Sequence, residues 1–471
     1  MKRLMPSLPL YLLAAVAALA GCAAPAPPLD AAPARSLPAT WLHATATTTA
    51  TEPGAASADH PDWWHAFGSA ELDAVVAEAQ QGSLDVAAAA ARVAQAQATA
   101  RIAGAALLPT VTAGVNSGRV LDTSAAGSTS NHGASLDARF DVDVWGRYRA
   151  GREGAQALLQ ASEFDRDTVR LTLTAGVAAA WLNEVALHER TAIAGLNLRN
   201  AERLLALVAA RAAAGAASPL ELAQQRGLVA GEQQRLAALQ QQAEAARTAL
   251  QLLLGRADAA AVHATSLAAL ATPAIGAGLP AQLLTRRPDI ARAEAQLRAA
   301  AADVQVARAA MLPALTITAG VGTAGDTLRR AFDNPVYALA AAVAAPVFDG
   351  GRLAAGQDFA RARQQELLVD YRRTLLAAWA DVELALNDAA SLDTQAARHA
   401  EALAQAQRAS ALAETRYRAG ADTLLTLLDA QRTLYAAQDL AVQLRRARLL
   451  SAVALYKALG GGWRAPDAKS P

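Results

Sequence analysis

Two long stretches of this chain contain no proline, and they limit its fold more than any other feature. The first covers residues 147–211, where only four glycines interrupt a helix-forming composition, and the second covers about 352–418. A helix of about 65 residues is about 100 Å long at 1.5 Å per residue. No compact globule contains such a rod alone, so these helices must pack laterally as a coiled coil or as a ring. The chain is 53% hydrophobic but only 4% aromatic, and abundant alanine permits close helix approach on several faces, which favours a ring.

The sequence is an internal duplication with an offset of 204 or 205 residues. An LP pair, a GR pair, an arginine four residues before a glycine, and an LG pair each occur twice, starting at Leu108 and Leu312, Gly146 and Gly351, Arg211 and Arg416, and Leu254 and Leu459. We expect two pseudo-symmetric halves, each with a helix, two strands, a very long helix, a turn and a helix. A tandem solenoid would need shorter and more numerous repeats.

Between the helices the period of the sequence changes to two. In one such stretch apolar side chains would lie on one face of a strand and charged ones on the other, namely Leu136, Phe140 and Val142 against Asp137, Arg139, Asp141 and Asp143. We predict strands at about 109–122, 133–145, 313–325 and 335–348, the last from an ambiguous pattern. Their length of about ten residues suits strands that cross an outer membrane. An ordinary half-buried hairpin is the alternative.

Four strands cannot close a barrel by themselves. An open sheet edge in hydrocarbon leaves backbone groups unsatisfied, at a cost of several kcal/mol each. If these strands enter a membrane, several chains must therefore each contribute four. A barrel continued by a helical tube of about 100 Å would be a conduit across the outer membrane and much of the periplasm.

Both long helices are expected to reverse at a glycine. Gly215 is followed by Ser218 and Glu221, which can form a capping box around a proline at the first helical position. Gly420 is followed by Asp422, which we expect to cap the next helix. Two helical hairpin tips should therefore project at the end far from the strands.

The N-terminus has the pattern of a lipoprotein export signal. Residues 1–21 combine two basic residues, an apolar run and small residues before the only cysteine, Cys22. We predict covalent lipid on Cys22, and Ala23 after it is consistent with delivery to the outer membrane. A signal peptide with a free thiol is the alternative. Residues 22–61, rich in alanine, proline and threonine, resemble an extended tether.

Composition and motifs argue against several other classes of function. A net charge of +1 gives no indication of nucleic-acid binding, and one cysteine excludes a disulfide framework. The seven histidines are scattered without metal-ligand spacing, and no nucleophile elbow or phosphate loop is present. We therefore predict no enzyme, no catalytic residue, no metal site and no cofactor. The motif at 286–289, RRPD, is interpreted as a helix start with a structural role.

Several segments together resemble the outer-membrane efflux proteins of the TolC type, and specifically the NodT-like lipoprotein branch. The matching segments are LLP at 107–109, VDVWGR at 142–147, LTRRPDI at 284–290, ARAAMLPALTITAGVG at 307–322, PVFDGGR at 346–352, RYRAGADTLLTLLDAQR at 416–432 and LYKALGGGW at 455–463. The resemblance implies a helix-dominated homotrimer with a twelve-stranded membrane β-barrel and a twelve-helix periplasmic α-barrel. It also implies a tripartite pump with a periplasmic adaptor and an inner-membrane pump of the resistance-nodulation-division class.

The resemblance also implies a periplasmic gate on the helix after the second tip. The pattern LTLLDAQR maps it to Leu425, Asp429 and Arg432. The spacing i, i+4 and i+7 places these side chains on one helix face, so an apolar, an acidic and a basic ring could stack along a lumen. A surface ion pair between Asp429 and Arg432 is the alternative.

The hairpin tips resemble the surface on which the family docks its adaptor. The residues concerned are Arg211, Gly215 and Ser218 in the first tip and Arg416, Tyr417, Gly420 and Asp422 in the second. The first tip has Ala212 where the family often has an aromatic residue, so the two docking grooves are expected to differ in strength.

We divide the chain into a signal peptide (1–21), a lipid-anchored segment (22–61), a first repeat (62–260), a connecting segment (261–287), a second repeat (288–463) and a tail (464–471). The function predicted is a passive exit duct for small molecules, held at the outer-membrane lipid. Two alternatives are the outer-membrane duct of a type I protein secretion system and a periplasmic coiled-coil scaffold lipoprotein.

Overall fold

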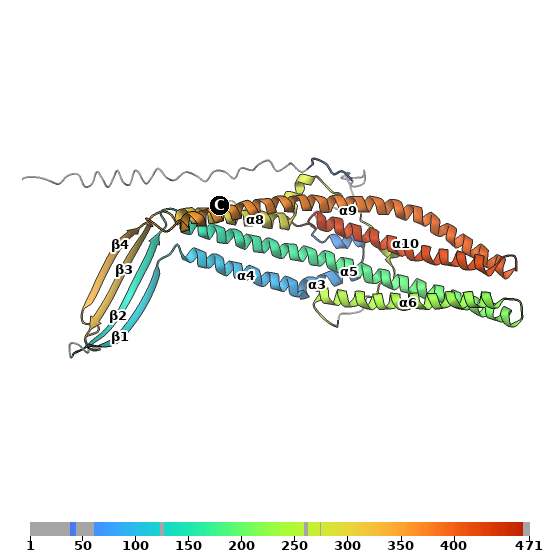
Figure 1. Cartoon of the computed structure of the whole chain (residues 1–471), viewed down its shortest axis with the longest axis horizontal. Helices are drawn as coiled ribbons and strands as arrows, with labels where there is room; N and C mark the ends of the chain where they lie inside the picture. The colour runs from blue at the N-terminus through green and yellow to red at the C-terminus, as the bar shows by residue number, and fades with distance from the viewer. Residues whose placement is uncertain (1–37, 44–60, 123–126, 259–261, 274, 465–471) are drawn as a thin grey trace, which may run out of the picture.

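The computed structural model describes residues 38–43, 61–122, 127–258, 262–273 and 275–464 as an elongated rod (Figure 1). A four-stranded sheet lies at one end and two helical hairpins lie at the other. Within the described ranges, no helix is both long enough and apolar enough to cross a membrane.

The described elements follow the predicted order in each half. The first half contains α4 (Leu84–Ala105), β1 (Thr110–Asp122), β2 (Gly127–Val142), α5 (Arg147–Ala213) and α6 (Pro219–Leu254). The second half contains α8 (Pro288–Ala309), β3 (Ala314–Gly325), β4 (Pro335–Ala344), α9 (Arg352–Arg418) and α10 (Leu424–Ala458). Shorter elements are η1 (Trp63–Phe67), α3 (Ala70–Gly82), η2 (Leu267–Ala269), η3 (Pro280–Gln282) and α7 (Leu283–Arg286). Helices α5 and α9 have 67 residues each, which confirms the two long rods.

The strands form one antiparallel sheet in the order β1–β2–β3–β4. β1 and β3 lie within one residue of their predicted bounds, and β4 ends four residues before the predicted end. β2 differs more: it starts at Gly127 rather than 133 and ends at Val142 rather than 145. Its early part, 127–132, pairs with β1 through Ser, Thr and Asn residues that carry no apolar alternation.

β2 ends before the predicted residue 145 because the Asp143 side chain binds the first turn of the helix that follows, α5. Its carboxylate accepts hydrogen bonds from the backbone N–H groups of Tyr148 (3.1 Å) and Arg149 (2.9 Å) in the first turn of α5. The chain turns at Gly146, whose φ of +77° favours glycine. A carboxylate at a helix N-terminus satisfies N–H groups that have no partner inside the helix.

Four helices lie side by side at each level of the rod (Figure 1). α5 and α9 run along its length. On the sheet side, α4 packs on α5, and α8 packs on both α5 and α9. On the tip side, α6 packs on α5, and α10 packs on both α5 and α9. Each long helix therefore runs beside two shorter helices that follow one another along the rod. One such pair is α4 and α6, and the other is α8 and α10.

The short helices meet near the middle of the rod at glycines. A Cβ atom on Gly255 would lie 2.5 Å from the carbonyl oxygen of Gly82, and one on Gly460 would collide with the carbonyl of Arg286. Both glycines also have positive φ, +73° and +96°. These glycines belong to the repeated LG pair of the sequence, which is therefore explained by backbone contact between helix ends.

A large apolar core surrounds these junctions. Trp63 is 2% exposed and stacks on Tyr456 with ring centroids 4.9 Å apart. Trp181 of α5 is fully buried in the same cluster, which also receives Trp41 from the N-terminal segment. Four of the seven tryptophans of the chain, including Trp64, are thus buried where several segments converge.

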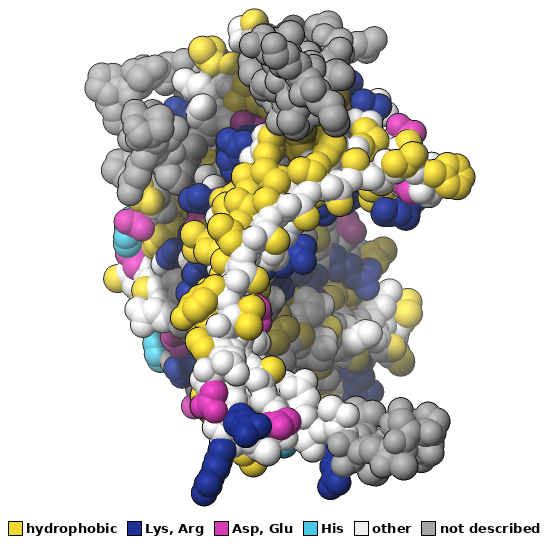
Figure 2. All heavy atoms as spheres, turned by 90° about the vertical axis from the view of Figure 1, so that its left-hand side faces the viewer, with side chains coloured by type: hydrophobic (Ala, Val, Ile, Leu, Met, Phe, Trp, Pro, Cys, Tyr) yellow, Lys and Arg dark blue, Asp and Glu magenta, His cyan; other side chains and the backbone are white. Residues whose placement is uncertain are grey.

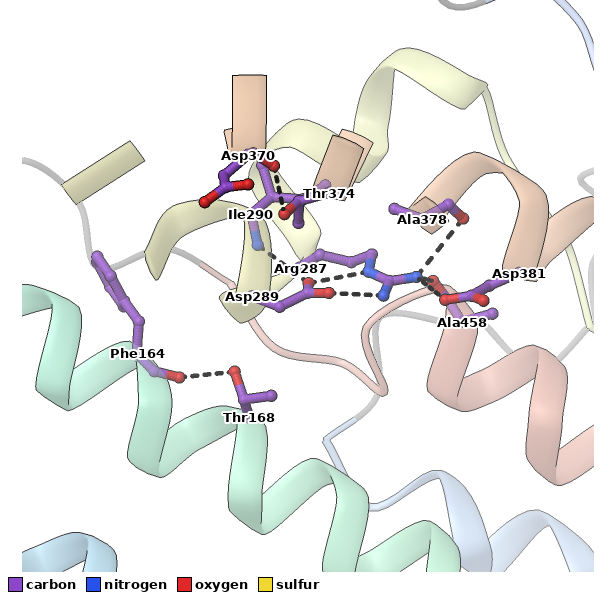
Figure 3. A network of polar contacts seen from close by, with 10 residues as sticks. All are labelled: Phe164, Thr168, Arg287, Asp289, Ile290, Asp370, Thr374, Ala378, Asp381 and Ala458. Atoms are coloured by element: carbon purple, nitrogen blue, oxygen red, sulfur yellow. Dashed lines mark hydrogen bonds and ion pairs between the residues drawn. The ribbon is translucent and has the colours of Figure 1, made fainter. Parts of the chain in front are cut away.

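Arg287 links the start of α8 to two other helices (Figure 3). Its guanidinium donates to Asp289 (2.7 Å), to Asp381 of α9 (3.0 Å) and to the carbonyl of Ala458 at the end of α10 (3.2 Å). Burial alone would raise the pKa of the Asp289 carboxyl. The hydrogen bonds and the charge of the Arg287 guanidinium lower this pKa by more, so that it lies below its ordinary value. The RRPD motif is a helix start, as predicted, and Pro288 occupies its first turn.

We predict that Arg287→Ala destabilises the rod by about 3–5 kcal/mol, because it leaves a half-buried carboxylate without its partner. The thermal unfolding midpoint, followed by circular dichroism, should fall. Because the pKa of Asp289 is lowered, the contribution of the pair is complete above the ordinary value of 3.8 and is lost as the pH falls through the lower folded-state value.

Arg363→Ala is the matched control. Arg363 pairs with Glu366 on the exposed surface of α9, 2.6 Å apart, and surface pairs contribute little. An equal fall of the unfolding midpoint in both variants would contradict the role given to Arg287.

Candidate functional site

The first hairpin tip joins α5 to α6 and has the predicted capping box. Gly215 adopts a φ of +71°. The Ser218 hydroxyl accepts from the Glu221 N–H (3.2 Å), and the Glu221 carboxylate accepts from the Ser218 N–H (2.7 Å). Together with Pro219 in the first turn, these contacts confirm the predicted helix start.

The second tip joins α9 to α10 and differs from the prediction in its cap. Gly420 turns the chain with a φ of +70°. Thr423, not Asp422, is the capping residue, because its hydroxyl accepts from the Thr426 N–H. Asp422 instead pairs with Arg416 (3.2 Å). Its carboxylate also accepts from the Thr423 N–H, and this hydrogen bond is the main reason that the pKa of Asp422 is lowered.

The two tips are held to each other by Arg211 and Tyr417. The Arg211 guanidinium lies 5.0 Å from the centre of the Tyr417 ring, a cation–π geometry between the two hairpins. Tyr417 is only 2% exposed and packs with leucines of α10. The Tyr417 side chain therefore lies inside the tip, and its predicted part in adaptor docking stays a prediction. Tyr417 corresponds to Ala212 in the first repeat, so the sequence already indicated that the two tips differ at this position.

The first turns of α10 present Leu425, Asp429 and Arg432 on one exposed face. Leu425 is 62% exposed, whereas its neighbours Leu424 and Leu427 are almost fully buried against the rest of the bundle. Within the described part of the chain, neither the Asp429 carboxylate nor the Arg432 guanidinium has an ion-pair partner. Asp429 and Arg432 therefore do not form the surface ion pair that was the alternative prediction.

A groove of about 900 Å³ separates the two hairpins, and sequence reasoning did not foresee it. Its walls come from α5 and α9, and its floor from α10. It is lined by Arg203, Arg211, Glu414, Arg418, Gln431 and Tyr435, among others. At about 100° per residue, the Leu425–Asp429–Arg432 face lies roughly 120° around α10 from this floor. The groove and that face are therefore on different sides of the helical layer.

The sheet has one apolar face that runs across all four strands. Directly paired residues share a face, so the register places Val111 of β1, Leu136 and Phe140 of β2, Val321 of β3 and Tyr337 of β4 together. Figure 2, seen from the sheet end, shows hydrophobic side chains gathered over the strands. Val115, Tyr337 and Leu339 are 79–88% exposed. The ambiguous pattern of β4 is resolved only by this register.

The opposite face of the sheet is polar or small. Asp137 lies opposite Thr112 of β1 and Gly320 of β3, and Arg139 lies between Thr110 and Thr318. The outer strands β1 and β4 each pair on one side only. A sheet with an apolar face, a polar face and two open edges suits the wall of a membrane pore built from several chains.

The predicted lipidation residue Cys22 lies outside the described residues. Among those that are described, no group of three His, Cys, Asp or Glu side chains could hold a metal ion.

Comparison with known proteins agrees with these features. Residues 75–256 and 279–461 match the model of a family described as outer membrane efflux protein. The chain is 47% identical to the pyoverdine export outer membrane protein OpmQ of Pseudomonas aeruginosa, over 97% of both chains. It is 31% identical to the cation efflux system protein CusC of Escherichia coli, over 85% of this chain and 88% of that one. The solved outer-membrane channel OprN superposes with a TM-score of 0.83 at 27% identity, over 91% of this chain and 98% of that one.

We predict that Tyr417→Leu loosens the second hairpin, because the cation–π contact with Arg211 contributes about 1 kcal/mol. Backbone amides near the end of α9, at 411–418, should exchange hydrogen for deuterium about fivefold faster, while those beside Arg287 stay unchanged. Tyr417→Phe keeps the ring and serves as the control. Equal protection in the Leu and wild-type chains would count against the contact.

Proposed function

Because the chain belongs to the outer membrane efflux protein family, we propose that three copies form one continuous duct from the periplasm to the cell exterior. The chain is the outer-membrane channel component of an efflux pump. In the trimer the three sheets close a twelve-stranded barrel, and the four helices at each level of each chain form a twelve-helix tube.

The observation that carries this proposal is the two-faced sheet with open edges. The exposed apolar face suits lipid, and the polar face with Asp137 and Arg139 suits a water-filled lumen. β1 of one copy and β4 of the next supply the partners that each edge lacks. A periplasmic scaffold would need neither feature.

The gate of the duct is the Leu425–Asp429–Arg432 face of α10. In a closed ring these side chains form stacked apolar, acidic and basic constrictions at the tip end. Their exposure, and the absence of an ion-pair partner for Asp429 or Arg432 among the residues that the structure describes, support this assignment, because side chains that line a lumen pack against no neighbouring helix.

A periplasmic adaptor binds the tips, and the groove between the hairpins receives part of it. The exposed backbone around Gly215 and Gly420, with Ser218, Arg416 and the partly exposed Asp422, forms the outer surface of the tips. Arg211 and Tyr417 then act from inside by holding the two hairpins at a fixed separation. An inner-membrane pump of the resistance-nodulation-division class delivers the cargo.

The cargo is a small molecule rather than a protein, and Cys22 carries the lipid anchor. Relatives named for pyoverdine export and cation efflux support small-molecule efflux over the type I secretion alternative. The 47% identity to the pyoverdine export protein, over 97% of both chains, makes a siderophore of the pyoverdine type the first cargo to test.

The channel assignment is tested with the purified full-length chain in planar bilayers. We expect trimers with a small resting conductance, and several-fold larger conductance in Asp429→Ala and Arg432→Ala, because each removes one charged ring from the constriction. Glu401→Ala and Arg408→Ala, exposed on α9, are the charge-matched controls. Unchanged conductance in both gate variants would falsify the gate, and a chain that stays monomeric would refute the duct itself.

The cargo assignment is tested by expressing the chain in Pseudomonas aeruginosa that lacks OpmQ. Pyoverdine in the medium should return towards the wild-type level, because the outer component passes what its pump delivers. A chain with Asp429→Ala should restore it as well. No recovery despite correct assembly with the host adaptor would reject this cargo.

A further inference from the structure

The N-terminal segment 38–43 lies against the middle of the rod, far from the sheet. Trp41 is 6% exposed, and its indole N–H donates to the carbonyl of Gly278 at 2.9 Å. It belongs to the central apolar core. This segment, here called the strap, is therefore bound to the body at a defined place.

A buried carboxylate of α9 holds the two residues that follow Trp41. Glu383 is 6% exposed and accepts from the N–H of Leu42 (2.7 Å) and of His43 (3.2 Å), while the His43 ring nitrogen Nδ1 lies 2.9 Å away. Within the described residues, all hydrogen-bond partners of this carboxylate come from the strap. A buried carboxylate without partners is strongly unfavourable, so α9 requires the strap in place.

The position of Glu383 fixes a distance along the rod. It lies 31 residues after Arg352, where α9 leaves the sheet, which is about 47 Å of helix. The 19 residues from Cys22 to Trp41 can extend over at most about 65 Å. A lipid on Cys22 can therefore reach the base of the sheet while Trp41 is bound, with at most about 18 Å of excess length.

We infer that Trp41, Leu42, His43 and Glu383 form a latch that sets the reach of the lipid anchor. With the latch closed, the acylated end is confined to the level of the membrane at the base of the sheet. The latch thus aligns the rod with the bilayer before the sheet edges of three copies pair. This inference rests on the proposed lipidation of Cys22 and on the proposed trimer.

The latch itself is tested by hydrogen exchange on the full-length lipoprotein. In Glu383→Ala, the amides of Leu42 and His43 should exchange about tenfold to a hundredfold faster, since each loses a hydrogen bond to a charged group. Trp41→Ala should do the same with Glu383 intact, which covers the case in which the Glu383 variant folds poorly. Glu401→Ala is the control on the same helix. Unchanged exchange in both latch variants would disprove the latch.

The reach is tested by shortening the tether. Deleting residues 24–31 brings Trp41 to the eleventh residue after Cys22, a span of at most about 37 Å, which is too short for a closed latch. We expect several-fold fewer heat-modifiable trimers in membranes. Glu383→Ala in the shortened chain should restore them, and Cys22→Ser should remove the effect of the deletion.

The outcomes separate this inference from the proposed function. Normal trimers in the shortened chain, with Leu42 and His43 still protected, would overturn the reach. Absence of rescue by Glu383→Ala would overturn it too. If the unmodified full-length chain forms no trimer, the proposed duct fails, and the exchange test still decides whether the latch exists.

Discussion

The rod depends on helix ends that meet, backbone against backbone, near its middle. Gly255, just after α6, allows close approach to Gly82, the last residue of α3 before α4 begins. Gly460, just after α10, allows the same approach to Arg286, just before α8. Arg287 strengthens the second junction, because its guanidinium binds the Ala458 carbonyl, which has no partner inside α10. Larger side chains at these glycines would separate the stacked helices. The long helices α5 and α9 would then lose neighbours along part of their length.

The same arrangement leaves matching open sides on the sheet and on the helices. β1 is one outer strand of the sheet, and it follows α4, which packs on α5 but not on α9. β4 is the other outer strand, and it leads into α9. The unpaired strand edges and the uncovered helix flanks therefore lie on the same two sides of the chain. One rotation between copies covers both kinds of open side, so the proposed barrel and the proposed helical tube follow from the same assembly.

Local patterns allowed much of this fold to be predicted. Absence of proline and two-residue alternation identified the long helices and three of the strands. The repeated glycines four residues after Arg211 and Arg416 identified the turns. Contacts between distant segments were not predictable. Asp422 has the chemistry of a cap, yet Arg416 draws its carboxylate aside and Thr423 takes the role. Tyr417 reads as an exposed tip residue until the first hairpin, with Arg211, covers it.

Extended segments in a helical body pose a separate problem, because their N–H groups have no strand to bind and helix carbonyls are already used. Buried and half-buried glutamates solve it here. Glu71 of α3 accepts from the N–H of His263 (2.6 Å) and Ala264 (3.0 Å), and Glu189 of α5 accepts from Leu267 (2.8 Å). Glu383 repeats the device with the strap. In a helix such glutamates look like ordinary surface residues, so the sequence pattern conceals them. Each one fixes where a described part of a connecting segment crosses the helices.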